Sequence, residues 1–133
     1  MLENKPAARI LIADDNPSML LLISHLLKGH GYEYRALNTV ERLSENIRSF
    51  HPDLILLDVC MGVEDGRNSC LEIKMNPDLA DIPVVLISGH PMDAESVADC
   101  GAADFLSKPF TVTEMITTVE TYRAHPVITE VLA

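Results

Sequence analysis

The stretch Arg9-Ile10-Leu11-Ile12-Ala13-Asp14-Asp15 decides the fold, because an apolar run ends abruptly at two carboxylates. An unbroken apolar run of this length is typical of a strand that is buried on both faces. Asn16-Pro17 follows at once; asparagine is a good helix N-cap, and proline favours the first helical position. The stretch therefore predicts a buried strand that leads directly into a helix.

The same alternation of strand and helix repeats along the chain. We expect strands over residues 9–13, 32–37, 53–57, 83–87 and 105–106, and helices over residues 16–29, 39–49, 67–74, 93–100 and 111–123. Residues 59–66, which contain two glycines, are expected to form a loop. Five alternations predict an α/β protein with a parallel sheet, helices on both faces and right-handed crossovers.

Composition excludes several classes of protein. The chain has 133 residues, which fits one domain, and its net charge of −10 disfavours direct binding to nucleic acid. No apolar stretch approaches the ~20 residues that span a bilayer, and the polar start carries no signal peptide, so we expect a cytoplasmic protein without membrane contact. Three cysteines and five histidines show no metal-ligand spacing and are interpreted as structural or surface residues.

Polar residues follow four of the five expected strands. Asp14 and Asp15 follow the first, Asp58 the third, Ser88 the fourth and Lys108 the fifth. In a parallel sheet these ends share one edge, where α/β proteins bind ligands. Three carboxylates at this edge favour a divalent cation such as Mg²⁺. A carboxylate can also accept a phosphoryl group, a reaction that needs mainly positioning and charge neutralisation.

Several motifs occur in one order along most of the chain. They are Ile10-Leu11-Ile12-Ala13-Asp14-Asp15, Leu54-Ile55-Leu56-Leu57-Asp58, Met61 with Asp65-Gly66, Ile82-Pro83-Val84-Val85-Leu86-Ile87-Ser88-Gly89 and Gly101-Ala102-Ala103-Asp104-Phe105-Leu106-Ser107-Lys108-Pro109-Phe110. In this order and spacing the sequence resembles the receiver domains of bacterial response regulators. The resemblance implies a flavodoxin-like, doubly wound five-stranded parallel sheet of order 2-1-3-4-5 with five helices. It also implies a receiver domain over residues 9–124, a flexible leader over 1–8, and a tail or the start of a connector over 125–133.

The resemblance implies a role for each matching residue. Asp58 would be the phosphoacceptor, Asp15 a direct Mg²⁺ ligand, and Asp14 a ligand through water. The backbone carbonyl of Cys60 would be a further Mg²⁺ ligand, together with Asp58 itself. Ser88 would be the switch hydroxyl, Lys108 the phosphate-sensing lysine and Phe105 the switch aromatic, although a lone aromatic in a short strand is equally well a core residue. The Lys108–Pro109 peptide bond would be cis.

The family also implies partners. A sensor histidine kinase or a phosphotransfer protein would donate the phosphoryl group in a Mg²⁺-dependent reaction, and a downstream effector domain or protein would respond. The chain would catalyse only its own phosphoryl transfer and autodephosphorylation, so it would not be a conventional enzyme. A homodimer through the fourth helix, fifth strand and fifth helix is left open by the resemblance.

The sequence departs from the family pattern at two places. Gly62 stands where proline is common, which predicts a more mobile loop, and the segment between Ser88 and Lys108 is short.

A receiver-like interaction module that works without phosphorylation is the alternative function, and the intact set of polar residues argues against it. An aspartate-nucleophile phosphatase needs a second acid two residues after the nucleophile, where this chain has Cys60.

Overall fold

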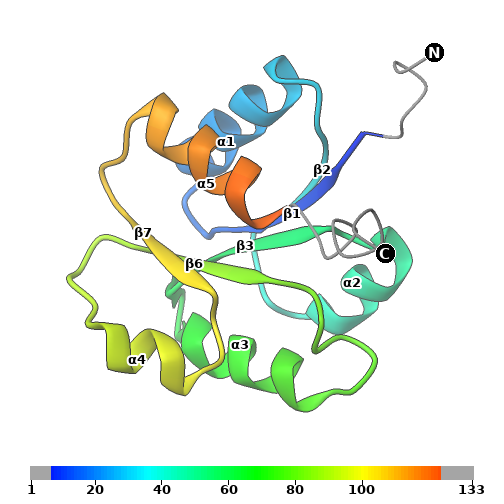
Figure 1. Ribbon diagram of the computed structural model, residues 1–133, viewed down its shortest axis with the longest axis vertical. Helices are drawn as coiled ribbons and strands as arrows, with labels where there is room; N and C mark the ends of the chain where they lie inside the picture. Colours follow the sequence, from blue (N-terminus) through cyan, green and yellow to red (C-terminus); the bar gives the residue numbers. More distant parts are fainter. Residues whose placement is uncertain (1–6, 124–133) are drawn as a thin grey trace, which may run out of the picture.

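The computed structural model describes residues 7–123 of the chain as alternating strands and helices (Figure 1). In chain order they are β1 (Arg9–Ala13), α1 (Pro17–Gly29), β2 (Glu33–Leu37), α2 (Leu43–Phe50), β3 (Leu54–Asp58), β4 (Cys60–Met61), β5 (Glu64–Asp65), α3 (Gly66–Met75), β6 (Val84–Ser88), α4 (Ala94–Asp99), β7 (Asp104–Ser107) and α5 (Val112–Tyr122). Among these residues no helix is long and apolar enough to cross a membrane. The expected leader and tail lie outside the described residues, apart from Ala7 and Ala8.

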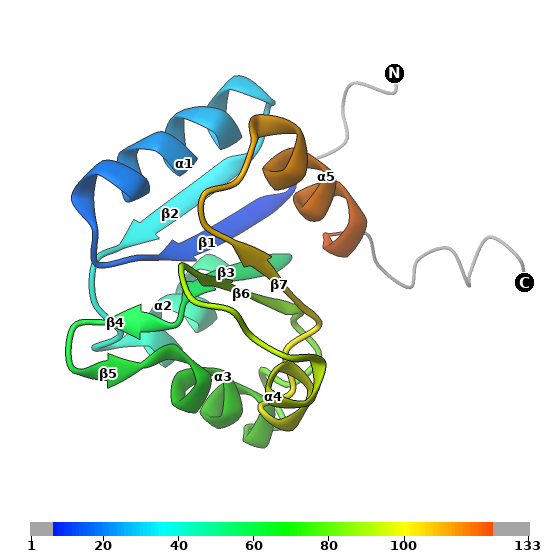
Figure 2. The ribbon, with the colours of Figure 1, turned by 90° about the vertical axis from the view of Figure 1, so that its left-hand side faces the viewer.

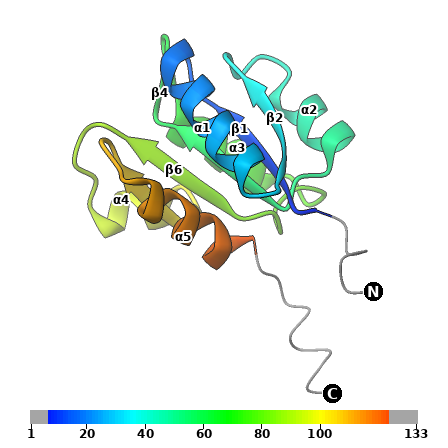
Figure 3. The same cartoon turned by 90° about the horizontal axis from the view of Figure 1, so that it is seen from above.

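Five parallel strands form the main sheet in the order β2-β1-β3-β6-β7. This is the predicted order 2-1-3-4-5 of a doubly wound sheet, and five helices cover it as predicted. Helices α1 and α5 cover one face, and α2, α3 and α4 cover the other (Figure 1). Seen from above, α1 and α5 lie next to each other over their face (Figure 3).

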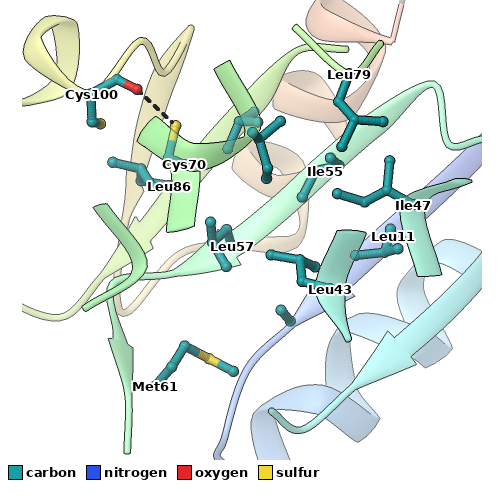
Figure 4. Packing of buried hydrophobic residues seen from close by; sticks show 13 residues of the cluster. Leu11, Leu43, Ile47, Ile55, Leu57, Met61, Cys70, Leu79, Leu86 and Cys100 are labelled. Atoms are coloured by element: carbon teal, nitrogen blue, oxygen red, sulfur yellow. Dashed lines mark hydrogen bonds between the residues drawn. The ribbon is translucent and has the colours of Figure 1, made fainter. Parts of the chain in front are cut away.

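The two faces of the sheet have separate hydrophobic cores. Every residue of the central strands β3 and β6 is buried, which explains their unbroken apolar runs. One face packs Leu11, Ile55 and Leu57 against α2 and α3 (Figure 4), and the other packs alternate strand residues against α1 and α5. Each fully buried leucine or isoleucine contributes about 1.5–3 kcal/mol, so these two layers hold the strand ends in place.

Side-chain caps set where most helices begin. Asn16 accepts a hydrogen bond from Met19 N at the start of α1, and Thr111 forms a capping box with Glu114 at the start of α5. The predicted start of the second helix at residue 39 is wrong, because α2 begins at Leu43. Arg42 has a left-handed backbone with φ 59°, and an L-residue in that conformation cannot continue a right-handed helix.

The segment expected to be a loop over residues 59–66 contains a short antiparallel hairpin. Strands β4 and β5 pair Cys60 with Asp65 and Met61 with Glu64, and the hairpin stands at the edge of the molecule beside α3 (Figure 2). Gly62 makes the turn with φ +66°, a conformation that favours glycine. Gly62 therefore supports a hairpin turn, and the greater mobility of this segment stays a prediction.

Candidate functional site

The carboxyl ends of β1 and β3 bring three aspartates together. Asp14 and Asp15 directly follow β1, and Asp58 is the last residue of β3. One carboxylate oxygen of each lies within 4.8 Å of the other two. Asp14 is 0% exposed and Asp58 is 3% exposed, whereas Asp15 is exposed. The predicted acidic cluster is therefore formed, with two members inside the protein and one facing solvent.

Lys108, which follows β7, joins this cluster. Its Nζ lies 3.1 Å from Asp14 Oδ2 and 3.2 Å from Asp58 Oδ2. The peptide bond to Pro109 is cis, as the resemblance implied. The backbone N–H of Lys108 donates to the carbonyl of Ser88 at 2.8 Å, so β7 and β6 hold the lysine at the sheet edge. One ammonium group thus bridges two buried carboxylates.

Backbone N–H groups orient each of the three carboxylates. Asn16 N donates to Asp14 Oδ1 at 2.9 Å, and Cys60 N donates to Asp58 Oδ1 at 3.2 Å. Gly62 N, from the turn of the β4–β5 hairpin, donates to Asp15 Oδ2 at 2.8 Å. These three backbone donors come from segments next to the strands and could not be assigned from residue type alone.

The charges of the cluster shift two pKa values. Burial raises the pKa of Asp58, and the negative charge of Asp14 raises it further; Lys108 and the Cys60 N–H act in the opposite direction without cancelling the effect. For Lys108, burial alone would lower the pKa, but its hydrogen bonds and ion pairs with Asp14 and Asp58 outweigh burial and raise it. Lys108 therefore stays charged, and one positive charge does not fully relieve two buried carboxylates.

The donor set fits Mg²⁺, which prefers oxygen ligands and keeps several waters. Three convergent carboxylates, one of them open to solvent, provide such oxygens and an excess of negative charge. The side chain of Cys60 is exposed, and its predicted contribution through the backbone carbonyl stays a prediction. The site is thus suited to a hard divalent cation on its solvent-exposed side, beside Asp15.

Ser88 and Phe105 lie close to the cluster in the sheet but point elsewhere. Ser88 Oγ donates to His90 O at 2.8 Å and accepts from His90 N at 3.0 Å, so its hydroxyl is bound to its own loop. Phe105 is half-buried in β7 and packs against the core under α2, α3 and α4. The structure places both residues on the strands that adjoin the site, β6 and β7, and within residues 7–123 neither side chain is hydrogen-bonded to Asp58.

Gly66 contributes to the site through its lack of a side chain, a role that the sequence motifs do not indicate. A Cβ at this position would collide with the backbone carbonyl of Asp58 and lie 3.0 Å from Val59 Cα. The Gly66 N–H also donates to Val59 O at 2.7 Å. Only glycine lets α3 begin this close to the end of β3. The signal in the sequence is its place directly after Asp65, the N-cap of α3.

The fold and the site define a class: a doubly wound α/β domain with an acidic cluster and a lysine at the carboxyl edge of its sheet. The chain belongs to the response regulator receiver domain family, whose model matches residues 10–120. It is therefore a module of two-component signalling rather than a conventional enzyme.

Two curated relatives support this assignment, and a solved structure shares the fold. The chain is 36% identical to the DNA-binding dual master transcriptional regulator RpaA of Synechocystis over 114 residues, which cover 84% of this chain and 47% of that protein. It is 31% identical to the polar-differentiation response regulator DivK of Brucella ovis over 116 residues, covering 85% of this chain and 94% of that protein. The first relatives are thus about twice as long as the segment they share with this chain. The chemotaxis response regulator CheY4 of Vibrio cholerae has the same fold, with a TM-score of 0.81 at 23% identity, covering 88% of this chain and 99% of that one.

Proposed function

We propose that this chain is a phosphoacceptor receiver domain in which Asp58 accepts a phosphoryl group in a Mg²⁺-dependent reaction. The observation that carries the proposal is the position of Lys108 Nζ, 3.1 Å from Asp14 and 3.2 Å from Asp58, beside the solvent-facing carboxylate of Asp15. A nucleophilic carboxylate, a fixed positive charge and an oxygen-rich cation site are the parts that phosphoryl transfer needs.

The chain's own residues divide the work of the transfer. A carboxylate oxygen of Asp58 forms a bond to phosphorus while the bond from phosphorus to the donor's leaving atom breaks, and the leaving group departs with that electron pair. Lys108 stabilises the negative charge on the phosphoryl oxygens as a point charge. Asp14, Asp15 and Asp58, with the carbonyl of Cys60, would hold Mg²⁺, which supplies further charge neutralisation when bound.

Phosphorylation of Asp58 would then change the hydrogen bonds of Ser88. The new group adds negative charge and acceptor oxygens at Asp58. Ser88 Oγ would give up its two hydrogen bonds with His90 and donate to a phosphoryl oxygen, and Phe105 would follow in β7. The surface of α4, β7 and α5 would change with them, which gives a downstream partner two states to distinguish.

Family membership supports the choice of partners. We propose a sensor histidine kinase or a phosphotransfer protein as donor, and an effector domain or protein as receiver of the signal. RpaA is named a DNA-binding regulator and DivK a response regulator of about this length, so both a longer and a stand-alone arrangement fit. The net charge of −10 argues against nucleic-acid binding by this domain itself. Its cytoplasmic location stays a prediction.

The direct test is incubation with acetyl phosphate and Mg²⁺ followed by intact mass measurement. We expect a gain of one phosphoryl group that is absent without Mg²⁺ and absent in Asp58→Asn. A folded wild-type protein that gains no phosphoryl group, and that also fails to bind beryllofluoride with Mg²⁺, would refute the phosphoacceptor role. The alternative, an interaction module that works without phosphorylation, would then be the better description of this chain.

A further inference from the structure

A groove lies beside the site, between the start of α2, the β4–β5 hairpin and α3. Its volume is about 580 Å³. Leu43, Met61 and Ile73 line it, and all three side chains belong to the core on that face of the sheet. Figure 4 shows Leu43 and Met61 at one end of this core. The groove therefore has an apolar floor that is continuous with the protein interior.

The rim of this groove is acidic. Four exposed glutamates line it. The basic residue of the same lining is Arg42, whose Nε lies 3.8 Å from Glu45 Oε1. The glutamates are Glu41, Glu45, Glu64 and Glu72. Val63, at the tip of the hairpin, also lines the groove and is 99% exposed. An apolar floor, an acidic rim and a fully exposed valine thus share one surface.

Charge and geometry decide which occupant fits. Within residues 7–123 only Asp14, Asp15 and Asp58 converge closely enough to hold a metal ion, so the glutamates of the rim are not a cation site. Nucleic acid and other polyanions would be repelled. A second copy of this chain, with a net charge of −10, would be repelled as well. A partner segment that carries positive charge and an apolar anchor side chain is complementary to this surface.

We propose that the groove binds a basic amphipathic helix of a partner protein, with an apolar side chain on the floor and lysines or arginines facing the glutamate rim. Helix recognition by an apolar groove is a common binding mode, and opposite charge on the two partners adds specificity. Leu43, Met61 and Ile73 are at most 7% exposed and close the floor of the groove, so the fully exposed Val63 supplies most of the apolar contact.

The groove shares the β4–β5 hairpin with the phosphorylation site. The hairpin begins two residues after Asp58, and its turn holds Asp15 through the Gly62 N–H at 2.8 Å. A partner that contacts Met61, Val63 or Glu64 therefore contacts the segment that orients these two carboxylates. The inference goes beyond the proposed function, since binding to the groove needs no phosphoryl group on Asp58.

The test uses the full chain without Mg²⁺ or phosphodonor, and a fluorescein-labelled amphipathic helix of leucine and lysine as the probe, followed by fluorescence anisotropy. The triple variant Glu45→Gln, Glu64→Gln and Glu72→Gln should weaken binding by about tenfold. The control triple Glu95→Gln, Glu114→Gln and Glu120→Gln makes the same change of charge on α4 and α5 and should weaken it by less than about twofold.

The apolar contact is tested separately with Val63→Ser, which changes a 99% exposed side chain and so should leave the fold intact. We expect about threefold weaker binding that persists at high salt. Amide shifts in a ¹H–¹⁵N spectrum should centre on α2, the hairpin and α3. Equal weakening by both triple variants, shifts centred on other elements, or no binding of the probe would each overturn the proposal. Because no phosphoryl transfer occurs in this assay, its outcome is independent of the role of Asp58.

Discussion

Two partly buried lysines of this protein have opposite pKa shifts. One lies at the carboxyl ends of the strands and the other near their amino ends. Lys108, at the carboxyl edge, contacts two carboxylates, and its pKa is raised because their attraction outweighs burial. Lys74, in α3, donates to the backbone carbonyls of Ala80 and Ile82 in the segment before β6, and burial lowers its pKa. Both side chains are tied down, but only one of them balances charge.

The difference separates the proposed phosphoacceptor site from a structural contact. Lys74 donates to neutral carbonyl acceptors in the segment before β6, and its stem lies against Gly101. Lys108 meets two acids that repel each other and that a Mg²⁺ ion and a phosphoryl group could also engage. We therefore expect substitutions of Lys74 to affect stability, and substitutions of Lys108 to affect chemistry.

The largest effect should come from exchanging each lysine for methionine. Lys108→Met should slow phosphorylation by acetyl phosphate by about 100-fold, because it removes the fixed charge that faces the phosphoryl oxygens. Lys74→Met should leave that rate unchanged but lower the free energy of unfolding by about 1–3 kcal/mol, since two carbonyls lose their donor. Rates from intact mass and urea unfolding curves measure the two effects. If Lys74→Met slowed phosphorylation as much as Lys108→Met, the distinction between the two sites would not hold.

A second comparison pairs two glycines, Gly66 at the carboxyl end of β3 and Gly29 at the end of α1. Gly66→Ala should lower the free energy of unfolding by about 2–3 kcal/mol, because its Cβ would collide with the Asp58 carbonyl. Gly29→Ala, at the last residue of α1 with nothing within 4 Å of the added Cβ, should raise stability by about 0.5 kcal/mol. Urea unfolding decides between them. A Gly66→Ala protein as stable as the wild type would show that the approach of α3 to β3 is looser than described.

A smaller effect is expected from Asp58→Asn in buffer without Mg²⁺. Burial and the charge of Asp14 disfavour the ionised form of Asp58, so a neutral side chain of the same shape should raise the free energy of unfolding by roughly 1 kcal/mol. Asp81→Asn, an exposed acid whose charge raises the pKa of Lys74, should change stability by less than about 0.5 kcal/mol. Loss of stability in Asp58→Asn would mean that the pair with Lys108 outweighs both burial and the repulsion from Asp14.

The smallest effect concerns pH. Because the folded-state pKa of Asp58 lies above its usual value of 3.8, the folded protein binds this proton more readily than the unfolded chain. Without Mg²⁺ this group therefore adds stability as the pH falls through its folded pKa toward 3.8. Mg²⁺ competes with the proton, so Mg²⁺ affinity should start to fall at a pH above the usual range of aspartate. Calorimetric Mg²⁺ titrations at stepped pH measure this onset, and an onset at or below 3.8 would contradict the raised pKa.

Much of the fold and of the site was predictable from sequence. The apolar runs of β1, β3 and β6 predicted buried parallel strands, and the polar residues at the strand ends predicted the acidic cluster that the structure forms. The cis bond before Pro109 was predicted by resemblance alone and is confirmed. These features depend on patterns that are local in the sequence or on parallel strands that end at one edge.

Other features depend on contacts that no local pattern shows. The left-handed Arg42 shortens α2, and the two-residue strands of the β4–β5 hairpin follow from the turn at Gly62. The hydrogen bonds of Ser88 with His90 depend on a side-chain rotamer, and the role of Gly66 depends on how closely α3 approaches β3. Sequence placed the residues at the right edge of the sheet but could not supply their orientation.

The most direct test of the account is to locate the phosphoryl group within the chain. After reaction with acetyl phosphate and Mg²⁺, borohydride reduction would convert an aspartyl phosphate to homoserine, and peptide mapping would identify the modified residue. We predict homoserine at position 58 alone, with Asp14 and Asp15 unchanged. Modification at Asp14 or Asp15, or phosphorylation that leaves Asp58 intact, would contradict the assignment of Asp58 as the phosphoacceptor.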